Sequence, residues 1–267
     1  MTEIPDFSTE SLIPFSIDLL FSETGVCLAK ATAFFYKKKD SLYLITNWHC
    51  FTGLNPRTKK QIGKHAGKSD TVRFRMHQQK GFEFNFFYFD TRLYNDELME
   101  SPRWLVHPKF KEQVDVVALE IKTSSEYKCI PVNDPELDFE DIRAKVADDV
   151  FILGYPYNIR QNGVLPIWKR ASISTEPDFD YEELPIILVD TASRSGMSGS
   201  PVILRRKGIY AKEGVGLTAT KQCFLGVYSG RILGETELEA QLGIVWKKEV
   251  IEEIITGNMN DEVKKFV

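Results

Sequence analysis

Short runs of strand-forming residues, each bounded by Gly, Pro, Asn or Asp, recur along the chain and constrain its fold more than any other feature. They are rich in Val, Ile, Phe and Tyr, residues that pack well on a pleated sheet. The runs cover residues 32–38, 42–46, 71–76, 82–89, 116–121, 150–155, 185–190, 201–204 and 223–229. Strands of this length and spacing predict an all-β sandwich or barrel.

A single clear helix is predicted, over residues 246–257, WKKEVIEEIITG. The residues that fall on one face at helical spacing are Val250, Ile251, Ile254 and Ile255. Gly257 stands where a left-handed residue commonly ends a helix. The chain of 267 residues is long enough for one large domain or two ordinary ones, and the polar, turn-rich residues 123–142 are where we expect a boundary.

Ser198 is the first candidate for chemistry, within GMSGSPV at residues 196–202. Clusters of Gly and Ser are also ordinary turn chemistry, so the stretch alone fits a turn or a nucleophile at the mouth of a strand. A serine hydroxyl becomes a good nucleophile only when an imidazole takes its proton and a carboxylate orients the imidazole. The rest of the chain therefore has to supply a histidine and an acid.

All four histidines precede Ser198. This order excludes an α/β-hydrolase, in which the histidine follows the serine, and position 200 is Ser where that family's motif has Gly. His49 is the best candidate, because it follows the strand-like residues 42–45 and precedes Gly53. Taken alone, His49 also fits a satisfied structural histidine.

Asp115 is the candidate acid, since it stands directly before the apolar run of residues 116–119. A carboxylate at the entrance of a buried strand is costly unless it is paired. By itself it also fits a turn residue that leads into a strand. Together, a histidine, an aspartate and a serine in this order indicate a catalytic triad.

The three stretches LITNWHC, DVVALEI and GMSGSPV resemble the triad blocks of chymotrypsin-like, or trypsin-like, serine peptidases. Within that family the chain is similar to the bacterial types that include the glutamyl endopeptidases and the Htr-type proteases. WLVHPKF, VFILGYP and FLGVYSG add to the resemblance, which runs from about residue 25 to about residue 255.

The resemblance implies two packed six-stranded antiparallel β-barrels with a C-terminal α-helix. The domains expected on this basis are an N-terminal extension (1–25), a first barrel with the histidine and aspartate (26–125), a linker (126–145), a second barrel with the serine (146–246) and a helix with a tail (247–267).

The resemblance also implies the role of each site residue. Ser198 is the nucleophile, His49 the general base and then general acid, and Asp115 the group that orients His49. The backbone N–H groups of Gly196 and Ser198 are expected to form the oxyanion hole. Ser229 matches the family position that hydrogen-bonds the triad aspartate. The predicted activity is a serine endopeptidase that forms an acyl-enzyme intermediate on a protein or peptide substrate.

Substrate binding is assigned by the resemblance to Ala192, Ser193, Tyr228, Ser229, Gly230 and Arg231. Ala192 at the pocket floor lacks the carboxylate that holds Lys or Arg, so no strong preference for basic residues is expected. Arg231 and the hydroxyls of Ser193 and Tyr228 fit an acidic residue before the cut. If Arg231 points to solvent, the pocket takes small or apolar residues instead.

Met197 departs from the family pattern of zymogen-activated digestive and clotting proteases, which carry an Asp at this position. Activation through an ion pair with a newly cut N-terminus is therefore excluded. A preformed site and control by a regulatory protein partner both stay open. A second function class also stays open: a protease-fold binding or effector module that is silent until a partner engages it.

The composition sets the expected location and partners. The first 30 residues carry several acids and no Lys or Arg before Lys30, so we expect no signal peptide and a cytoplasmic protein. No apolar run approaches the roughly 20 residues that span a bilayer. Four cysteines without a Cys-x-x-Cys pair predict free thiols and no metal site or cofactor. The net charge of −4 argues against a nucleic-acid partner.

Overall fold

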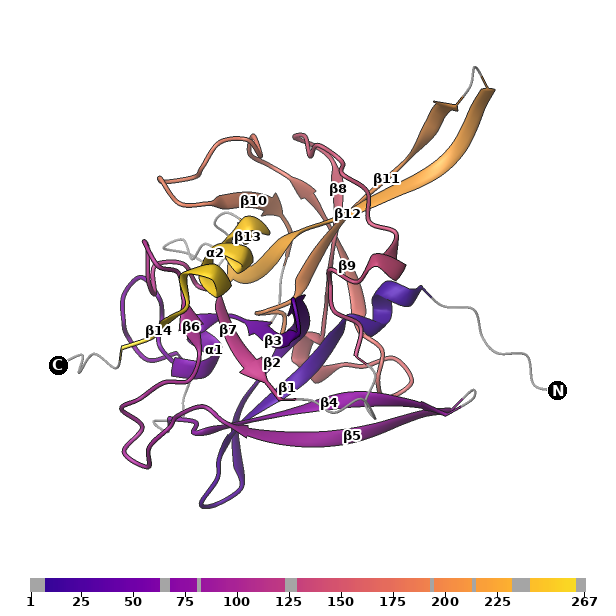
Figure 1. The fold of residues 1–267 in the computed structure, drawn as a ribbon. Coiled ribbons are helices and arrows are strands. Elements are labelled where there is room, and N and C mark those ends of the chain that lie inside the picture. The colour runs from indigo at the N-terminus through magenta and orange to yellow at the C-terminus, as the bar shows by residue number, and fades with distance from the viewer. Residues whose placement is uncertain are drawn as a thin grey trace.

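The computed structural model describes residues 8–62, 68–80, 83–122, 129–192, 195–212, 215–231 and 241–262. Strands dominate it, in a closed barrel and a second, separate sheet, with a helix near the C-terminal end (Figure 1). The all-β fold class predicted from the sequence is therefore confirmed. Both α-helices within the described ranges are far too short to span a bilayer.

The N-terminal half of the chain forms an antiparallel sheet whose strand order is β14-β6-β7-β3-β2-β1-β4-β5. Its strands are β1 (Pro14–Phe21), β2 (Val26–Lys38), β3 (Ser41–Thr46), β4 (Thr71–Lys80), β5 (Glu83–Arg92), β6 (Leu105–Val106), β7 (Val117–Ile121) and β14 (Met259–Asn260). The hairpin of β4 and β5 runs along the lower side of the molecule in Figure 1.

The second half forms a closed antiparallel barrel in the order β10-β13-β12-β11-β8-β9. Its strands are β8 (Asp149–Gly154), β9 (Ile167–Ile173), β10 (Ile186–Asp190), β11 (Pro201–Lys212), β12 (Val215–Arg231) and β13 (Leu242–Lys247). Strands β11 and β12 continue past the barrel as a long projecting hairpin (Figure 1).

Two features of the first sheet differ from the six-stranded barrel that the resemblance implies. Strand β1 lies inside residues 1–25, the expected N-terminal extension, and it pairs with both β2 and β4. Strand β14 comes from the expected C-terminal tail and adds to β6. The described strands of this half thus form one eight-stranded sheet.

The helices are short. They are α1 (Trp48–Thr52), α2 (Glu249–Gly257) and the 3-10 turns η1 (Thr9–Leu12), η2 (Pro135–Leu137) and η3 (Pro156–Asn158). Helix α2 buries the four apolar residues predicted from its pattern. The left-handed residue that ends it is Asn258 rather than Gly257, whose missing side chain leaves room for Pro108, about 2.7 Å from where a Cβ would stand.

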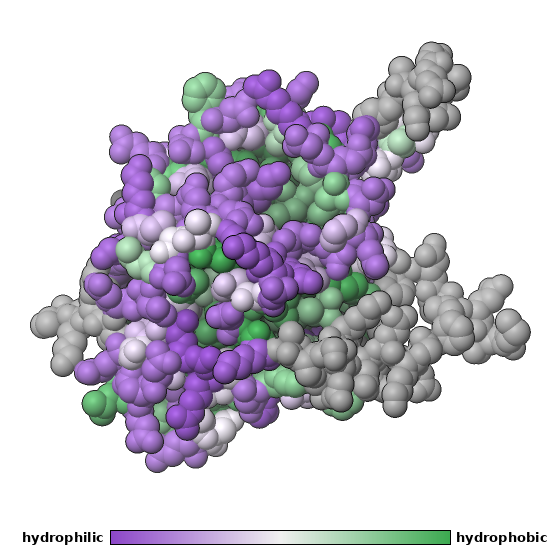
Figure 2. All heavy atoms as spheres, in the orientation of Figure 1, coloured by the Kyte–Doolittle hydropathy of each residue, from purple (hydrophilic) through white to green (hydrophobic). Residues whose placement is uncertain are grey.

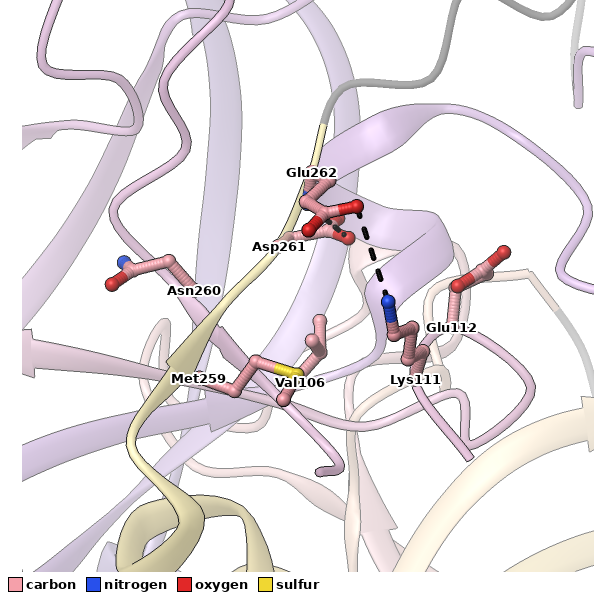
Figure 3. A pocket seen from close by; sticks show the side chains of 7 residues that line it. All are labelled: Val106, Lys111, Glu112, Met259, Asn260, Asp261 and Glu262. Carbon is pink, nitrogen blue, oxygen red and sulfur yellow. Dashed lines mark hydrogen bonds and ion pairs between the residues drawn. The ribbon is translucent and has the colours of Figure 1, made fainter. Parts of the chain in front are cut away.

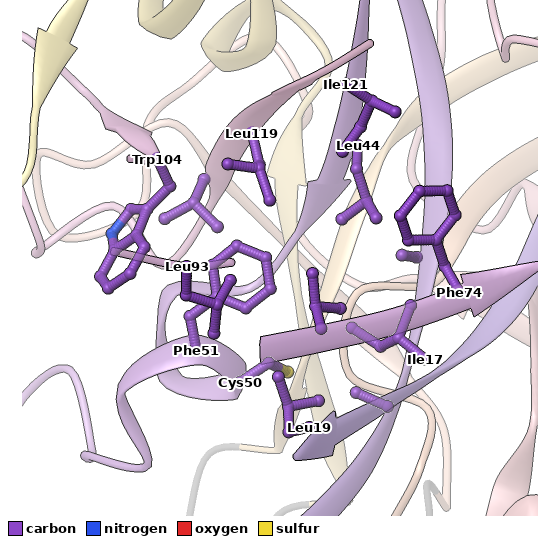
Figure 4. Packing of buried hydrophobic residues seen from close by; sticks show 14 of the residues in the cluster. Ile17, Leu19, Leu44, Cys50, Phe51, Phe74, Leu93, Trp104, Leu119 and Ile121 are labelled. Atoms are coloured by element: carbon purple, nitrogen blue, oxygen red, sulfur yellow. The ribbon is translucent and has the colours of Figure 1, made fainter. Parts of the chain in front are cut away.

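Apolar side chains fill three clusters. One lies within the N-terminal sheet and includes Phe51, Phe74 and Trp104 (Figure 4). Another lies inside the barrel. The third joins the two halves, since it combines residues of β2, β3 and β7 with residues of the barrel and of α2. The sheet and the barrel therefore pack against each other.

Charged and polar residues cover most of the face shown in Figure 2, with smaller apolar areas between them.

Candidate active site

The three candidate catalytic residues lie where the two halves meet. His49 is in α1, directly after β3 ends at Thr46. Asp115 stands two residues before β7 begins at Val117. Ser198 is in the turn between β10 and β11. His49 and Asp115 thus lie at the ends of the neighbouring strands β3 and β7, and Ser198 lies at an end of the barrel strands β10 and β11.

Helix α1 is a single short turn that was not predicted from the sequence. Asn47 is still extended, and the helix then runs to Thr52. Gly53 ends it in the left-handed region, with φ 70°, and its N–H donates to the His49 carbonyl at 2.9 Å. The prediction of His49 at the end of a strand was thus close, because only Asn47 and Trp48 separate it from β3.

His49 and Asp115 form a two-point contact. The His49 ring Nδ1 lies 2.6 Å from Asp115 Oδ2, and the backbone N–H of His49 donates to Asp115 Oδ1 at 2.9 Å. The Asp115 side chain is 2% exposed, so the carboxylate is almost fully removed from water. The Ser229 hydroxyl also donates to Asp115 Oδ2, and Asn47 Nδ2 donates to the Asp115 carbonyl at 2.7 Å.

This contact fixes the chemistry of the ring. A carboxylate can only accept, so Nδ1 of His49 carries a hydrogen and Nε2 is the basic nitrogen of the neutral ring. Burial lowers the pKa of His49, but the charge and hydrogen bond of Asp115 outweigh burial and hold this pKa well above its usual range. The ring is therefore an oriented and strengthened base.

The turn around Ser198 is held on the barrel side by backbone bonds. Gly199 N–H donates to the Tyr228 carbonyl at 2.9 Å, and Tyr228 N–H donates to the Ser200 carbonyl at 2.8 Å. Ser200 N–H donates to the Met197 carbonyl at 3.1 Å, which closes the turn. The Ser198 turn is therefore anchored to β12, next to Ser229.

The same turn is held on the other side by the N-terminal sheet. Thr32 N–H in β2 donates to the Ser198 carbonyl at 2.9 Å, and the Thr32 carbonyl accepts from Thr46 Oγ1 at 2.8 Å. A side chain at Gly199, which has φ 81°, would clash with the Thr32 carbonyl and with Thr46 Oγ1. This places the Ser198 turn against Thr46, three residues before His49.

The structure brings His49, Asp115 and Ser229 together by hydrogen bonds and sets Ser198 in the adjoining turn. No hydrogen bond joins the Ser198 hydroxyl to His49 or to another side chain among the described residues. Such contacts are often long in enzymes without substrate and tighten on binding. The arrangement supports a His–Asp base beside a partly exposed serine.

Gly196, which is expected in the oxyanion hole, has a backbone that favours glycine. Its φ is 95°, and a side chain there would clash with the Tyr155 carbonyl oxygen. The Gly196 carbonyl is turned away and accepts from Thr32 Oγ1 at 2.8 Å. The backbone N–H groups of Gly196 and Ser198 donate to no described residue. Two donors therefore remain available at the nucleophile.

The residues expected to bind substrate differ in how deeply they are buried. Ala192 is partly buried, whereas Tyr228 is fully buried, with Cε2 2.6 Å from where a Cβ of Gly243 would stand. A Cβ at Gly230 would meet nothing within 4 Å, so open space lies beside this residue. Ser193 lies outside the described residues, as does the side chain of Arg231, whose backbone belongs to β12.

Two residues that hold the site were not identified from the sequence. Thr32 bonds the nucleophile turn through its N–H and its hydroxyl, and nothing marks it within a strand-forming run. Tyr155 sets its carbonyl against Gly196. Met197, which departs from the zymogen pattern, is fully buried in the apolar cluster of the barrel. Apolar packing thus holds the residue beside the nucleophile.

The chain is similar to known proteins in sequence and in structure. A protein-family model described as a trypsin-like peptidase domain matches residues 31–209. No curated protein matches the sequence. Among solved structures, Rv3671c from M. tuberculosis, described as a serine-to-alanine mutant in its inactive form, is 17% identical with TM-score 0.46, covering 93% of this chain and 86% of that chain. The protease Anisep from Arthrobacter nicotinovorans is 12% identical with TM-score 0.47, covering 96% and 97%.

Proposed function

The chain belongs to the trypsin-like peptidase domain family, and from this premise we propose that it is a serine endopeptidase that works through His49, Asp115 and Ser198. Membership of a peptidase family implies protein substrates. The observation that carries the proposal is the His49–Asp115 contact, because it leaves Nε2 of His49 as the base beside the Ser198 turn.

The proposed reaction has two halves. Ser198 Oγ attacks the peptide carbonyl carbon while His49 Nε2 takes the hydroxyl proton. The tetrahedral intermediate then breaks its C–N bond, and His49 returns the proton to the departing amine, which leaves an ester on Ser198. Water attacks this ester with His49 again as the base, and the acid product and the free serine are released.

Two further groups stabilise charge in this scheme. The N–H groups of Gly196 and Ser198 donate to the oxygen that becomes negative in each tetrahedral intermediate. Asp115 stabilises the imidazolium of His49 when it holds the proton. Asp115 keeps this position because its oxygens accept from His49 and from Ser229.

We propose that the enzyme does not favour Lys or Arg before the cut, because Ala192 offers no carboxylate. Tyr228 is fully buried against Gly243, so its hydroxyl is not presented to a substrate side chain in this structure. An acidic preference requires Arg231 to reach the pocket. A peptide library separates the two cases: enrichment of Glu or Asp that is lost in Arg231→Ala supports the acidic pocket, and enrichment of Val, Ala or Leu in both proteins supports the small one.

The test of the proposed activity is hydrolysis of that library by the wild-type protein and by His49→Ala. We expect internal cleavage by the wild type and a loss of about 10⁴-fold or more in the variant. Equal cleavage by both proteins would reject the assignment of His49. Binding of a peptide without cleavage, under all conditions, would favour the second candidate, a silent protease-fold binding module.

A further inference from the structure

The helix that carries His49 depends on contacts made outside itself. Helix α1 has five residues, which is too few for a helix to be stable on its own. Asn47 precedes it without a side-chain hydrogen bond to its first turn. The position of His49 therefore rests on the side chains that α1 packs and bonds, above all Trp48 and Phe51, which are 3% and 0% exposed.

Asp261 supplies a hydrogen bond to this helix from the other end of the chain. Its Oδ2 accepts from Trp48 Nε1 at 2.7 Å and from Trp104 Nε1 at 3.1 Å. The Trp104 ring in turn packs on Phe51 of α1, with ring centroids 5.5 Å apart. One carboxylate oxygen thus connects both indoles that support the helix.

Backbone pairing directs Asp261 to this place. After α2, strand β14 pairs with β6 through Met259 opposite Val106, and the Asp261 N–H continues the contact by donating to the Trp104 carbonyl at 3.2 Å. Figure 3 shows Asp261 and Glu262 following β14 at the edge of a small pocket, where Lys111 pairs with Glu262. None of the residues that line this pocket belongs to the triad.

Partial burial of the Asp261 carboxylate costs free energy, because it removes a charge from water. Burial raises the pKa of Asp261, and the hydrogen bonds from Trp48, Trp104 and Glu262 N–H only partly oppose it. No Lys, Arg or His among the described residues forms an ion pair with Asp261, although Lys68 attracts it from a longer distance. A partly buried acid without an ion pair is better explained by the geometry that it imposes on its partners.

We propose that Asp261 is a positioning residue for His49, acting through the indole of Trp48 and the start of α1. The inference rests on the proposed function of His49 as the base. Without this bond α1 is free to shift relative to β7, and the His49–Asp115 contact loosens. Misplacement of His49 by about 1 Å lowers the rate by up to about 10²-fold. We expect this loss in kcat, with KM little changed.

The test compares three variants of the full chain. Asp261→Leu removes both acceptors at similar size, and kcat should fall by about 10- to 100-fold. Asp261→Asn keeps an oxygen that can accept from the indoles, so its kcat should stay within a few fold of the wild-type value. Asn260→Ala is the matched control, because Asn260 adjoins Asp261 in the chain and its side chain donates to the Pro102 carbonyl, not to an indole. Its kcat should equal that of the wild type.

A second readout separates this inference from the proposed activity. The Nδ1 proton of His49, hydrogen-bonded to Asp115, is expected at low field in the proton NMR spectrum. This signal should weaken or move in Asp261→Leu, stay in Asp261→Asn and Asn260→Ala, and be present whether or not the protein cleaves peptides. An unchanged signal together with an unchanged kcat in Asp261→Leu would overturn the inference.

Trp48→Phe keeps the test decisive if Asp261→Leu does not fold. It removes the same hydrogen bond from the helix side and should change kcat and the His49 signal in the same way. Where both single variants fold, the double variant should lose no more activity than either one, since the two residues act through one bond. Additive losses in the double variant would contradict the positioning role of Asp261. So would a Trp48→Phe protein with the wild-type kcat and the wild-type His49 proton signal.

Discussion

His49 and Ser198 are held at the site by different kinds of bond. The Ser198 turn is fixed mainly by backbone hydrogen bonds to Thr32 and Tyr228, with one side-chain bond from the Thr32 hydroxyl to the Gly196 carbonyl, and by the close approach of Gly196 and Gly199 to neighbouring carbonyls. The His49 helix is fixed by side chains, namely Asp115 and Asp261. Backbone bonds survive most substitutions, whereas side-chain bonds do not. The Ser198 turn, apart from its glycines and Ser198 itself, should therefore tolerate substitution better than the His49 helix.

Loss of the nucleophile should give the largest effect. Ser198→Ala removes only a partly exposed hydroxyl, and the backbone bonds of its turn remain. We expect the rate to fall by about 10⁴- to 10⁶-fold, with an unchanged unfolding temperature. Peptide hydrolysis and thermal unfolding measure the two quantities. Wild-type activity in this variant would show that another residue is the nucleophile.

Asp115→Asn should have the next largest effect, on the side of the site held by side chains. The amide can donate to Nδ1 of His49, so the ring would keep its hydrogen on Nε2 and lose its function as a base. The expected loss in kcat is about 10⁴-fold. Measurement of kcat against pH checks it: a variant with the wild-type rate and pH profile would mean that Asp115 has only a structural role.

Gly196→Ala tests whether the Ser198 turn is as rigid as its backbone hydrogen bonds imply. A Cβ there would clash with the Tyr155 carbonyl, so the turn must move and the oxyanion donors with it. We expect a loss of about 10²- to 10³-fold in kcat. Gly25→Ala is the control, because Gly25 also has positive φ, 67°, and a Cβ there would meet nothing within 4 Å. Equal activity of the two variants would contradict the account.

Ser229→Ala should have a smaller effect on the same pair. It removes one donor to Asp115 Oδ2 and leaves both contacts with His49. A hydrogen bond to a charged group contributes about 1.5 to 3 kcal/mol, and part of this is recovered by solvent or by adjustment, so we expect about a tenfold fall in kcat. A loss as large as that of Asp115→Asn would mean that Ser229 does more than support Asp115.

The smallest effect expected is that of reductant. The cysteines at positions 27, 50, 129 and 223 are free in the structure. Titration of the unfolded protein with a thiol reagent should find all four thiols, and the unfolding temperature should be the same with and without reductant. A native disulfide found by mass analysis would contradict both this prediction and the expected cytoplasmic location.

The elements that could be predicted from the sequence are those with a local signal. Strands β3, β7 and β11 read as apolar runs, and α2 reads as an amphipathic stripe. His49, Asp115 and Ser198 stand near the ends of such runs, which is why they could be identified as candidates. Strand β1 was missed although its apolar and polar residues alternate from Phe15 to Leu19, because it lies before residue 25, where the family resemblance begins.

The supports of the site could not be predicted, because they depend on tertiary contacts. Thr32 is one threonine inside a strand, and only the packing of the two halves brings its N–H to Ser198. Strand β14 has two residues and no recognisable pattern. The bond from Asp261 to Trp48 joins residues 213 positions apart, and neither residue has a local signal for it.

Covalent labelling with a fluorophosphonate is the most direct test of an assembled site, because the reagent reacts with a serine that an oriented base activates. The central claim predicts one adduct per chain, on the peptide that contains Ser198. It also predicts that labelling is lost in His49→Ala and strongly slowed in Asp115→Asn. No adduct on the folded wild-type protein, or an adduct at another serine, would contradict the claim.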